Sequence, residues 1–561
     1  MTAIVNHARR SGDRGAHLPT LGRSGTVAVA LAALGTIAAI LLQAPAVRTD
    51  AAYGLLAAMQ HEAGRSPDIF TLREADGHDL TRDTARRVSQ WAPSYQVVPY
   101  AFHRLGLGWG GAVRLTVLLA WACGAIGWAL YFRAVLGPGA RLGWLLALFL
   151  LARPSHDQAY AYTGGEGLEW GAFPAVLLVN LRAMTQRDGA KGLALAALAG
   201  ALAGTLFVIR HGAAVAAAGL GATWAMGAVA GRLRWRPALA WGVGAGVVSA
   251  AIVAAGFPGG RTVVDIVYES PPWAWVWPLV AWPLALADLD SLLRWLRGWL
   301  GPLPVAEDGL LLASALVALV LLALAWQAAG RGAGTRSPEL VRSAAAWTAV
   351  ITLGTTVGLL AVLYGRGSAI SFEGRHLRLG ILPILPFLFE RIEAASRAHR
   401  PARRWLAIAA FLLFFTVPAA FGAGSLVDKA VIRRARTVAL VGPQGLRLDF
   451  LGPGVNARAL YAELRARAPD PASVIVVPHP EEAFAVADRR LLVLRADRLP
   501  LAFLRTLAYH GRPPGGVVLV LPRALDQDGR RRAAQAAFRD VDRWEELGFD
   551  GTPAWVLWWG H

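Results

Sequence analysis

The sequence predicts a polytopic α-helical membrane protein that ends in a small α/β domain outside the membrane. Of its 561 residues, 55% are hydrophobic and 17% are charged, whereas ordinary soluble domains carry about 25% charged residues. The hydrophobic residues form blocks, most of them about 18 residues or more in length, which suffices for a helix to cross about 30 Å of hydrocarbon. After residue 425 these blocks end, and short β-rich runs alternate with helical stretches instead.

Eleven blocks are candidate membrane spans, and the charges between them predict their orientation. Arg and Lys are concentrated in alternate loops, such as "LRAMTQRDGAK" and "RIEAASRAHRPARR", while "PSHDQAYAYTGGEGLE" has none. Because basic loops stay in the cytoplasm, we expect a multi-pass protein of the cytoplasmic (inner) membrane with its N-terminus inside and its C-terminus outside. The spans are expected near residues 25–44, 108–132, 142–153, 169–185, 192–209, 212–230, 237–256, 308–328, 344–364, 377–390 and 405–424.

The two ends of the chain and its charge fit this arrangement. Residues 1–24 are basic and are expected to form a cytoplasmic tail, and the apolar block behind them lacks a clear cleavage site, which favours a retained helix over a signal peptide. The net charge of +19 does not indicate a nucleic-acid partner, because the arginines lie mostly between apolar blocks, where they orient helices. The single cysteine, Cys123, excludes an intrachain disulfide bond.

Two of the expected outer loops in the transmembrane module (residues 25–425) are long, namely residues 45–107 and 257–307. The second contains "PPWAWVWPLVAWPLALA", in which we expect no straight span, because proline breaks helices and tryptophan prefers the membrane interface. The next piece, "LDSLLRWLRGWL", is amphipathic and is expected to lie flat on the membrane. The alternative is one more, kinked span.

Residues 426–561 are expected to form the small extracytoplasmic α/β domain. We expect strands in "VALVGP", "SVIVVP", "RLLVLRA" and "GGVVLVLP", and helices in "NARALYAELRARA" and "GRRRAAQAAFRDVDRWEEL". The "GPQG" and "GPG" sequences within residues 442–454 lack the strand–GxGxxG–helix context of a nucleotide site, so we expect turns there.

Ionisable side chains at membrane depth are costly, so each is a candidate functional residue, although many snorkel or pair instead. With the predicted topology, four segments bring such groups to the outer face. The first segment supplies Asp50, and the last, "SFEGRHLRLGILPILPFL", supplies Arg375 and Arg378. The two loops between them supply His156, Asp157, Glu166, Glu169, Arg210 and His211.

These segments resemble, in order and spacing, the membrane glycosyltransferases of the GT-C superfamily. "TDAAYGLLAAMQ" resembles the family's first outer loop, where an Asp precedes a juxtamembrane helix, and "WAPSYQVVPYAFHRLGLGWGGAVRLTVLL" resembles the start of the next span. "LFLLARPSHDQAYAYTGGEGLEW" resembles the end of span three, and "SFEGRHLRLGILPILPFL" resembles the late R-x-L-x-P-x-x-P segment near the lipid phosphate. Protein O-mannosyltransferases, aminoarabinose transferases and bacterial mannosyl- and arabinosyltransferases share these features.

The resemblance implies transfer of a sugar, with inversion, from a polyprenyl-phosphate donor to a glycan, lipid or protein acceptor outside the cytoplasm. Asp50 is then the general base that takes the acceptor's proton. Arg375 binds the donor phosphate in a planar fork, or Arg378 does so one turn later. The remaining six candidates are then possible substrate-binding residues.

Each role has a structural alternative. Asp50 would cap a helix that begins at Ala51, Arg375 would anchor the chain at the interface, and Arg210–His211 would form a hairpin tip or a buried pair. The acids and the histidine between spans three and four would simply form a solvated polar loop.

The sequence also bears on a metal and on other functions. Some GT-C members hold a metal with two acids in the first loop, but two alanines follow Asp50, so we expect no metal unless Asp76, Asp79 or Asp83 supplies the second acid. A flippase or transporter of lipid-linked saccharides is disfavoured, because the charges gather at one face rather than at the midplane. A polysaccharide polymerase or ligase remains open as an alternative.

Overall fold

The computed structural model describes most of the membrane module and parts of the C-terminal region. The described residues are 23–63, 92–186, 189–255, 271–289, 292–293, 307–328, 339–368, 373–397, 399–428, 438–448, 457–467, 474–477, 481, 483–484, 487, 490–493, 516–522, 543–549 and 552–560. The expected flat helix "LDSLLRWLRGWL" and the first-loop acids Asp76, Asp79 and Asp83 lie mostly or wholly outside these residues.

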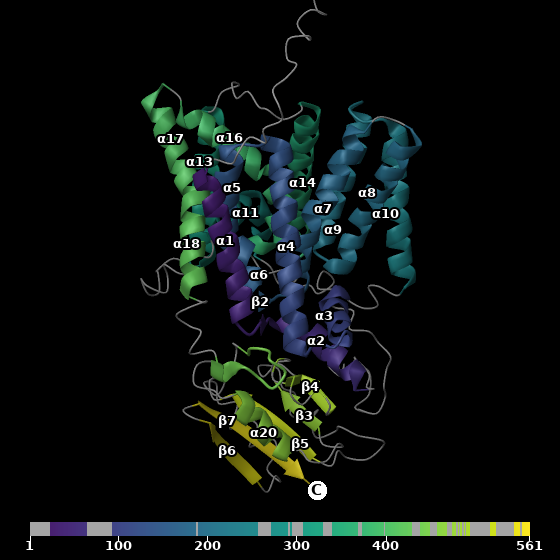
Figure 1. Ribbon diagram of the computed structural model, residues 1–561, viewed down its shortest axis with the longest axis vertical. Helices are drawn as coiled ribbons and strands as arrows, with labels where there is room; N and C mark the ends of the chain where they lie inside the picture. Colours follow the sequence, from purple (N-terminus) through teal and green to yellow (C-terminus); the bar gives the residue numbers. More distant parts are fainter. Residues whose placement is uncertain are drawn as a thin grey trace, which may run out of the picture.

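A bundle of long helices forms the body of the protein (Figure 1). A helix lies at each of the eleven ranges expected to span the membrane. Six of the described helical stretches are long and apolar enough to cross a bilayer, and shorter apolar helices accompany them, so the prediction of a multi-pass membrane protein is confirmed while the count of eleven stays a prediction. The helices are α1 Arg23–Leu42, α4 Trp109–Leu136, α5 Ala140–Leu151, α7 Gly165–Thr185, α8 Ala190–Ile209, α9 Ala213–Val229, α10 Trp235–Ala254, α13 Glu307–Ala328, α14 Glu339–Gly365, α16 Leu385–Ser396, α17 Pro401–Phe411 and α18 Val417–Val427.

Small residues let these helices approach closely, as is common in membrane bundles. Gly124 of α4 faces Trp170 of α7, and a Cβ atom at this glycine would lie 2.0 Å from the indole ring. Behind this contact, the buried Asn180 of α7 accepts hydrogen bonds from Trp224 Nε1 of α9 (2.9 Å) and Trp241 Nε1 of α10 (2.8 Å). One amide oxygen thus satisfies two indole donors and joins three helices.

Prolines divide the tenth expected span into short pieces. The chain runs through η4 Gly374–His376, α15 Arg378–Ile381, η5 Leu382–Ile384 and then α16. Because Pro383 and Pro386 lack the N–H that a continuous helix needs, the tighter 3₁₀ turn replaces the α-helix there. A π-turn, η6 Leu412–Thr416, joins α17 to α18 just before Pro418 for the same reason.

The Trp- and Pro-rich segment lies inside the bundle. After η3 Ala274–Val276 it forms α11 Trp277–Ala287, which packs against α13 and α14. The side chain of Trp277 is 2% exposed and Ala281 is fully buried. The helix has 11 residues, which is too few to span a bilayer, as expected from the prolines. Its tryptophans were expected at the membrane interface, but Trp277 is buried inside the bundle.

Short elements cover the lower end of the bundle in Figure 1. They are β1 Ala46–Val47, α2 Thr49–Glu62, α3 Ser94–Arg104, α6 Arg153–Tyr160 and β2 Ala161–Tyr162. The strands β1 and β2 pair in parallel, with Ala46 opposite Ala161 and Val47 opposite Tyr162. This two-stranded ladder fixes the chain that follows the first span to the chain that precedes α7.

The described C-terminal strands form one sheet at the same end of the molecule (Figure 1). Its order is β4-β3-β5-β7-β6, in which β3 is parallel to β4 and β5 while β7 is antiparallel to β5 and β6. The strands expected in "SVIVVP", "RLLVLRA" and "GGVVLVLP" are confirmed, as is the helix in "NARALYAELRARA". The elements are β3 Val474–Val477, β4 Arg490–Val493, β5 Gly516–Pro522, β6 Arg543–Phe549, β7 Thr552–Gly560 and α20 Ala457–Arg467.

Two C-terminal expectations are wrong where the structure describes the residues. "VALVGP" begins with a 3₁₀ turn, η8 Val438–Leu440, and residues 543–547 at the end of the expected helix "GRRRAAQAAFRDVDRWEEL" belong to strand β6. Residues 529–542 of that expected helix lie outside the described residues. Phe549 pairs with Thr552, so only Asp550 and Gly551 separate β6 from β7. Asp-Gly is a strongly favoured two-residue hairpin sequence. The pairing of β6 with β7 outweighs the helical propensity of residues 543–547. The extent of residues 426–561 as a domain, and its side of the membrane, stay predictions.

Candidate functional site

Asp50 stands at the start of α2, directly after the β1–β2 ladder. The Arg48 N–H donates to Tyr162 O at 2.9 Å, which extends the ladder by one bond. The helix begins at Thr49 with Arg48 at the N-cap position and no side-chain cap, so the alternative in which Asp50 caps a helix beginning at Ala51 is wrong. Asp50 is exposed in the first helical turn, where the positive end of the helix favours its negative charge.

Four of the candidate residues form one connected cluster of ion pairs. Glu166 Oε1 accepts from Arg210 Nη2 and from Arg375 Nη1, both at 3.1 Å. Arg210 Nη1 also donates to Glu169 Oε2 at 2.9 Å. These side chains come from the first two turns of α7, the turn between α8 and α9, and η4, so three distant segments meet here.

The charges in this cluster are matched and partly shielded from water. The side chains of Arg210, Glu166 and Glu169 are 14%, 15% and 5% exposed, whereas that of Arg375 is 36% exposed. Burial by itself would lower the pKa of Arg210, but Glu169 and Glu166 raise it above its ordinary value. Arg210 is therefore the fixed, inner cation of the cluster, and Arg375 is the outer one.

Three further ionisable residues, Glu373, His376 and Arg378, lie in the same segment as Arg375. Arg375 Nε lies 2.8 Å from Glu373 Oε2, while Arg378 makes no ion pair within the part of the chain that the structure describes. Burial lowers the pKa of His376 well below its usual value, and Arg210, Arg375 and Arg378 lower it further. The imidazole thus stays neutral among three guanidinium groups.

Tyr95 of α3 links Asp50 to this cluster. Burial raises the pKa of Tyr95 to about 12, Arg210 opposes this shift, and Glu166, Asp50 and Glu169 add to it. Tyr95 packs against Gly54 of α2 and against Gly164 and Gly165, and Gly165 also lies close to Arg210, so the ring lies between α2 and the cluster. Three segments therefore surround one ring that the sequence analysis did not identify as a site residue.

The packing around Tyr95 explains how the segments are held. A Cβ atom at Gly164 would lie 2.5 Å from the Tyr95 ring, and one at Gly54 of α2 would lie 2.9 Å from its Cβ. Tyr162 Oη donates to Tyr95 O at 2.7 Å, and Ser94 Oγ donates to Ile209 O at 2.6 Å. These contacts fix α3 against α2, β2 and the turn that carries Arg210.

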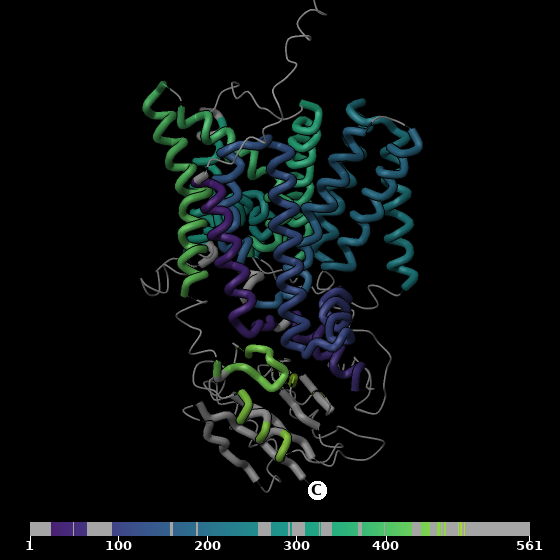
Figure 2. Tube along the Cα trace, viewed as in Figure 1, coloured from purple at the N-terminus to yellow at the C-terminus, as the bar shows by residue number. Residues whose placement is uncertain are grey.

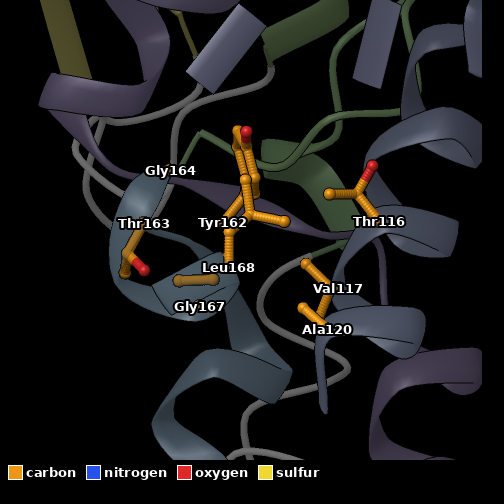
Figure 3. Close-up of a pocket in the computed structure, with 9 residues that line it drawn as sticks. Thr116, Val117, Ala120, Tyr162, Thr163, Gly164, Gly167 and Leu168 are labelled. Atoms are coloured by element: carbon orange, nitrogen blue, oxygen red, sulfur yellow. The ribbon is translucent and has the colours of Figure 1, made fainter. Parts of the chain in front are cut away.

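A small cavity lies between α4 and the beginning of α7 (Figure 3). Its volume of about 10 Å³ is near the lower limit for one water molecule. Figure 3 shows that Thr163, Gly164, Gly167 and Leu168 form one wall and Thr116, Val117 and Ala120 the other.

The other candidate residues lie in different surroundings. His156 is buried, and its Nε2 is hydrogen-bonded to Leu151 O at 3.0 Å. Its ring lies against Gly422 of α18. Asp157 lies in α6. His211 stacks on Phe207 next to Arg210, and burial lowers its pKa. The roles of all these residues stay predictions.

Three residues near the site were missed by the sequence analysis. Tyr95, Glu373 and His376 lie within quoted segments, "WAPSYQVVPY" and "SFEGRHLRLGILPILPFL", but neither segment shows which side chains turn inward. Among the described residues, no group of three His, Cys, Asp or Glu side chains is placed to hold a metal ion.

Solved structures with the same fold provide the comparison with known proteins. Two crystal structures of ArnT, a GT-C aminoarabinose transferase from Cupriavidus metallidurans, match 95% of this chain and 97% of theirs at 14% sequence identity. The TM-score is 0.52 for the apo state and 0.51 for the state bound to undecaprenyl phosphate. No protein-family model and no curated protein sequence matches the chain. The chain therefore has the same fold as ArnT, which agrees with the fold expected from the resemblance.

Proposed function

We propose that this chain is a membrane glycosyltransferase that moves a sugar from a polyprenyl-phosphate donor to a hydroxyl group of an acceptor. The observation that carries the proposal is that the chain shares its fold with a transferase whose crystal structure holds undecaprenyl phosphate. The gathering of Asp50, Glu166, Arg210 and Arg375 at one end of the helical bundle supports it, because a phosphate-linked sugar needs both a base and cations.

In the proposed reaction Asp50 is the general base. The acceptor oxygen forms a bond to the anomeric carbon of the sugar, and Asp50 takes the proton of that hydroxyl group. The bond between the anomeric carbon and the phosphate oxygen breaks, and the lipid phosphate leaves with the electron pair. Attack opposite to the leaving group inverts the anomeric configuration. The exposed position of Asp50 at the start of α2 supports access by an acceptor.

Arg375 is the proposed phosphate-binding residue, and Glu166 holds it in place. A guanidinium group presents five N–H donors, and Arg375 uses Nη1 on Glu166 and directs Nε towards Glu373. Its partial exposure leaves the remaining donors available to phosphate oxygens. Because the carboxylates orient the guanidinium before the donor binds, little conformational freedom is lost on binding. Arg378 is the second candidate for this role.

The proposed topology places this site on the outer face of the membrane. The candidate acid and arginines would then face the compartment in which nucleotide sugars are not normally supplied, which favours a lipid-linked donor. The C-terminal sheet lies at the same end of the molecule as α2 and α3 (Figure 1), so it would be extracytoplasmic as well. A glycan, lipid or protein on that side is the proposed acceptor.

The test is transfer by the purified protein in nanodiscs. A panel of radiolabelled polyprenyl-phosphate hexoses, pentoses and amino-pentoses is offered with an acceptor extract, in parallel with the matching nucleotide sugars after lipid carriers have been removed. We expect label in the acceptor from a polyprenyl-phosphate sugar, and no label with Asp50→Asn protein. Transfer from a nucleotide sugar alone would contradict the proposal.

A further inference from the structure

The residues that lead into Asp50 are held from two sides. On one side β1 pairs with β2, and on the other side Ala46 forms a parallel bridge to Arg447. The Arg447 N–H also donates to Pro45 O at 2.9 Å. A segment more than 390 positions later in the chain thus lies beside β1 like a third strand.

We propose that residues 438–448, called here the clamp segment, position Asp50 relative to Glu166, and that Arg447 is their main positioning residue. The C-terminal region would then be part of the working site and not only an appendage. The inference rests on the proposed function only in that it takes Asp50 as the reacting base. Figure 2 shows the clamp segment, in light green, between the helical bundle and α20.

The side chain of Arg447 holds the end of the first span. Arg447 is 6% exposed, and its Nη1 donates to Gln43 Oε1 at 2.9 Å. Gln43, also 6% exposed, accepts on its backbone oxygen from Arg114 Nη2 of α4 at 3.1 Å. Two guanidinium groups therefore fix the first residue after α1. Because a buried guanidinium group is costly without hydrogen-bond partners, Arg447 depends on its contact with Gln43.

The main chain of the clamp segment touches the main chain of α4. Gly110 N donates to Gln444 O at 2.9 Å, and a Cβ atom at Gly110 would lie 2.6 Å from Gly445 O. Gly445 has a φ of +74°, and the Gly442 N–H closes the turn on Leu446 O at 2.9 Å. Two glycines are thus required for this docking, one for the close approach and one for the turn.

The same region also holds the far end of α2. Gln60, fully buried near the C-terminus of α2, donates to Ala487 O, and Gln444 Nε2 donates to Phe484 O at 2.7 Å. The C-terminal region therefore contacts both the chain that leads into α2 and the last turns of α2 itself.

The experiment compares two neighbouring glycines of α4 in the full-length protein. Gly110→Ala pushes a methyl group into Gly445 O, whereas Gly111→Ala meets only Leu107 Cβ at 3.8 Å and serves as the control. The readouts are amide hydrogen exchange at Arg48, whose N–H bonds to Tyr162 O, donor affinity, and kcat for transfer. Amide hydrogen exchange measures how often the structure opens locally, and it can be measured without any sugar transfer.

We expect Gly110→Ala and Arg447→Ala to raise the exchange rate at Arg48 by about tenfold or more. Both should lower kcat by about 10- to 100-fold, since small misplacements of a reacting group have effects of this size, while the donor Kd changes by less than about twofold. Arg447→Lys keeps one donor for Gln43 and should restore part of kcat. Gly111→Ala should behave like the parent.

Unchanged exchange at Arg48 in both Gly110→Ala and Arg447→Ala would overturn the inference. Raised exchange with an undiminished kcat would overturn it as well, because the clamp segment would then only stabilise the fold. If Gly110→Ala does not fold, the comparison of Arg447→Ala with Arg447→Lys decides. A parent protein that transfers no sugar from any donor refutes the proposed function, and exchange at Arg48 then still decides whether the clamp segment holds β1.

Discussion

Arg375 donates to Glu166 across 3.1 Å, although the two residues lie 209 positions apart in the chain. The same carboxylate oxygen accepts from Arg210, so both lone pairs of that oxygen are used. Glu166 is thereby the point at which α7, the α8–α9 turn and η4 are joined. This geometry gives the outer arginine a fixed orientation before any ligand arrives, and the following predictions depend on it.

Arg375→Ala should weaken binding of a polyprenyl-phosphate sugar by about 10- to 100-fold, the usual range for losing hydrogen bonds to a charged group. Arg375→Lys should recover only part of this, because Lys lacks the planar fork. The measurement is the donor Kd in nanodiscs, and Arg366→Ala, an exposed arginine just after α14, is the matched control. Equal affinity in all variants would remove the role from Arg375 and transfer the test to Arg378.

Asp50→Asn should abolish most turnover while leaving expression and donor affinity close to those of the parent. The amide keeps the size of the side chain but cannot take a proton, and general bases typically contribute about 10²- to 10⁴-fold in rate. The measurement is single-turnover transfer at saturating donor. Glu62→Gln, at the other end of α2 where the acid pairs with His103, should keep the parent rate. Near-parental transfer by Asp50→Asn would show that this carboxylate is not the base.

Glu169→Gln should destabilise the protein by about 2 kcal/mol, because it leaves the buried Arg210 with one carboxylate partner instead of two. Glu393→Gln is the control, since its partners Arg141 and Arg397 are 40% and 65% exposed, and exposed pairs contribute about 0–1 kcal/mol. Thermal unfolding in detergent should give a clearly lower Tm for Glu169→Gln than for Glu393→Gln. Equal Tm values would mean that Arg210 does not depend on Glu169.

His376 should make the folded protein less stable in acid. Its pKa is lowered well below the usual value by burial and by Arg210, Arg375 and Arg378, so the folded state keeps the imidazole neutral. Below about pH 6.5, the ordinary pKa of histidine, the unfolded chain binds a proton that the folded chain does not. Stability is therefore complete above this pH and falls below it. His376→Gln should flatten the decrease of Tm between pH 7 and pH 5, and an unchanged slope would contradict this.

A reporter that is active only outside the cytoplasm should be active when fused after His561. The same reporter inserted in the loop between α7 and α8, at residues 187–188, should be silent, because the basic loop "LRAMTQRDGAK" is expected to stay inside. The reverse pattern would mean that the whole chain has the opposite orientation in the membrane and would place Asp50 on the cytoplasmic side.

Local sequence patterns were sufficient for much of the fold. The apolar blocks predict the helices, since a bilayer-crossing helix needs a long run of hydrophobic residues wherever it stands in the bundle. The strands β3, β4 and β5 follow from short β-branched runs in the same way. The pattern failed for β6, where the hairpin partner β7 decides the conformation, and the Trp–Pro segment proved to be a buried helix because α13 and α14 cover it.

By itself, then, the sequence determined the class of protein, the positions of its helices and the set of charged residues at one end of them. Only the tertiary structure decided which of these residues meet. Glu166, Arg210 and Arg375 form one cluster while His156 packs against α18, and Arg447 lies beside β1. The physical reason is that a helix or strand is specified by neighbours along the chain, whereas an ion pair between distant segments depends on how whole helices pack.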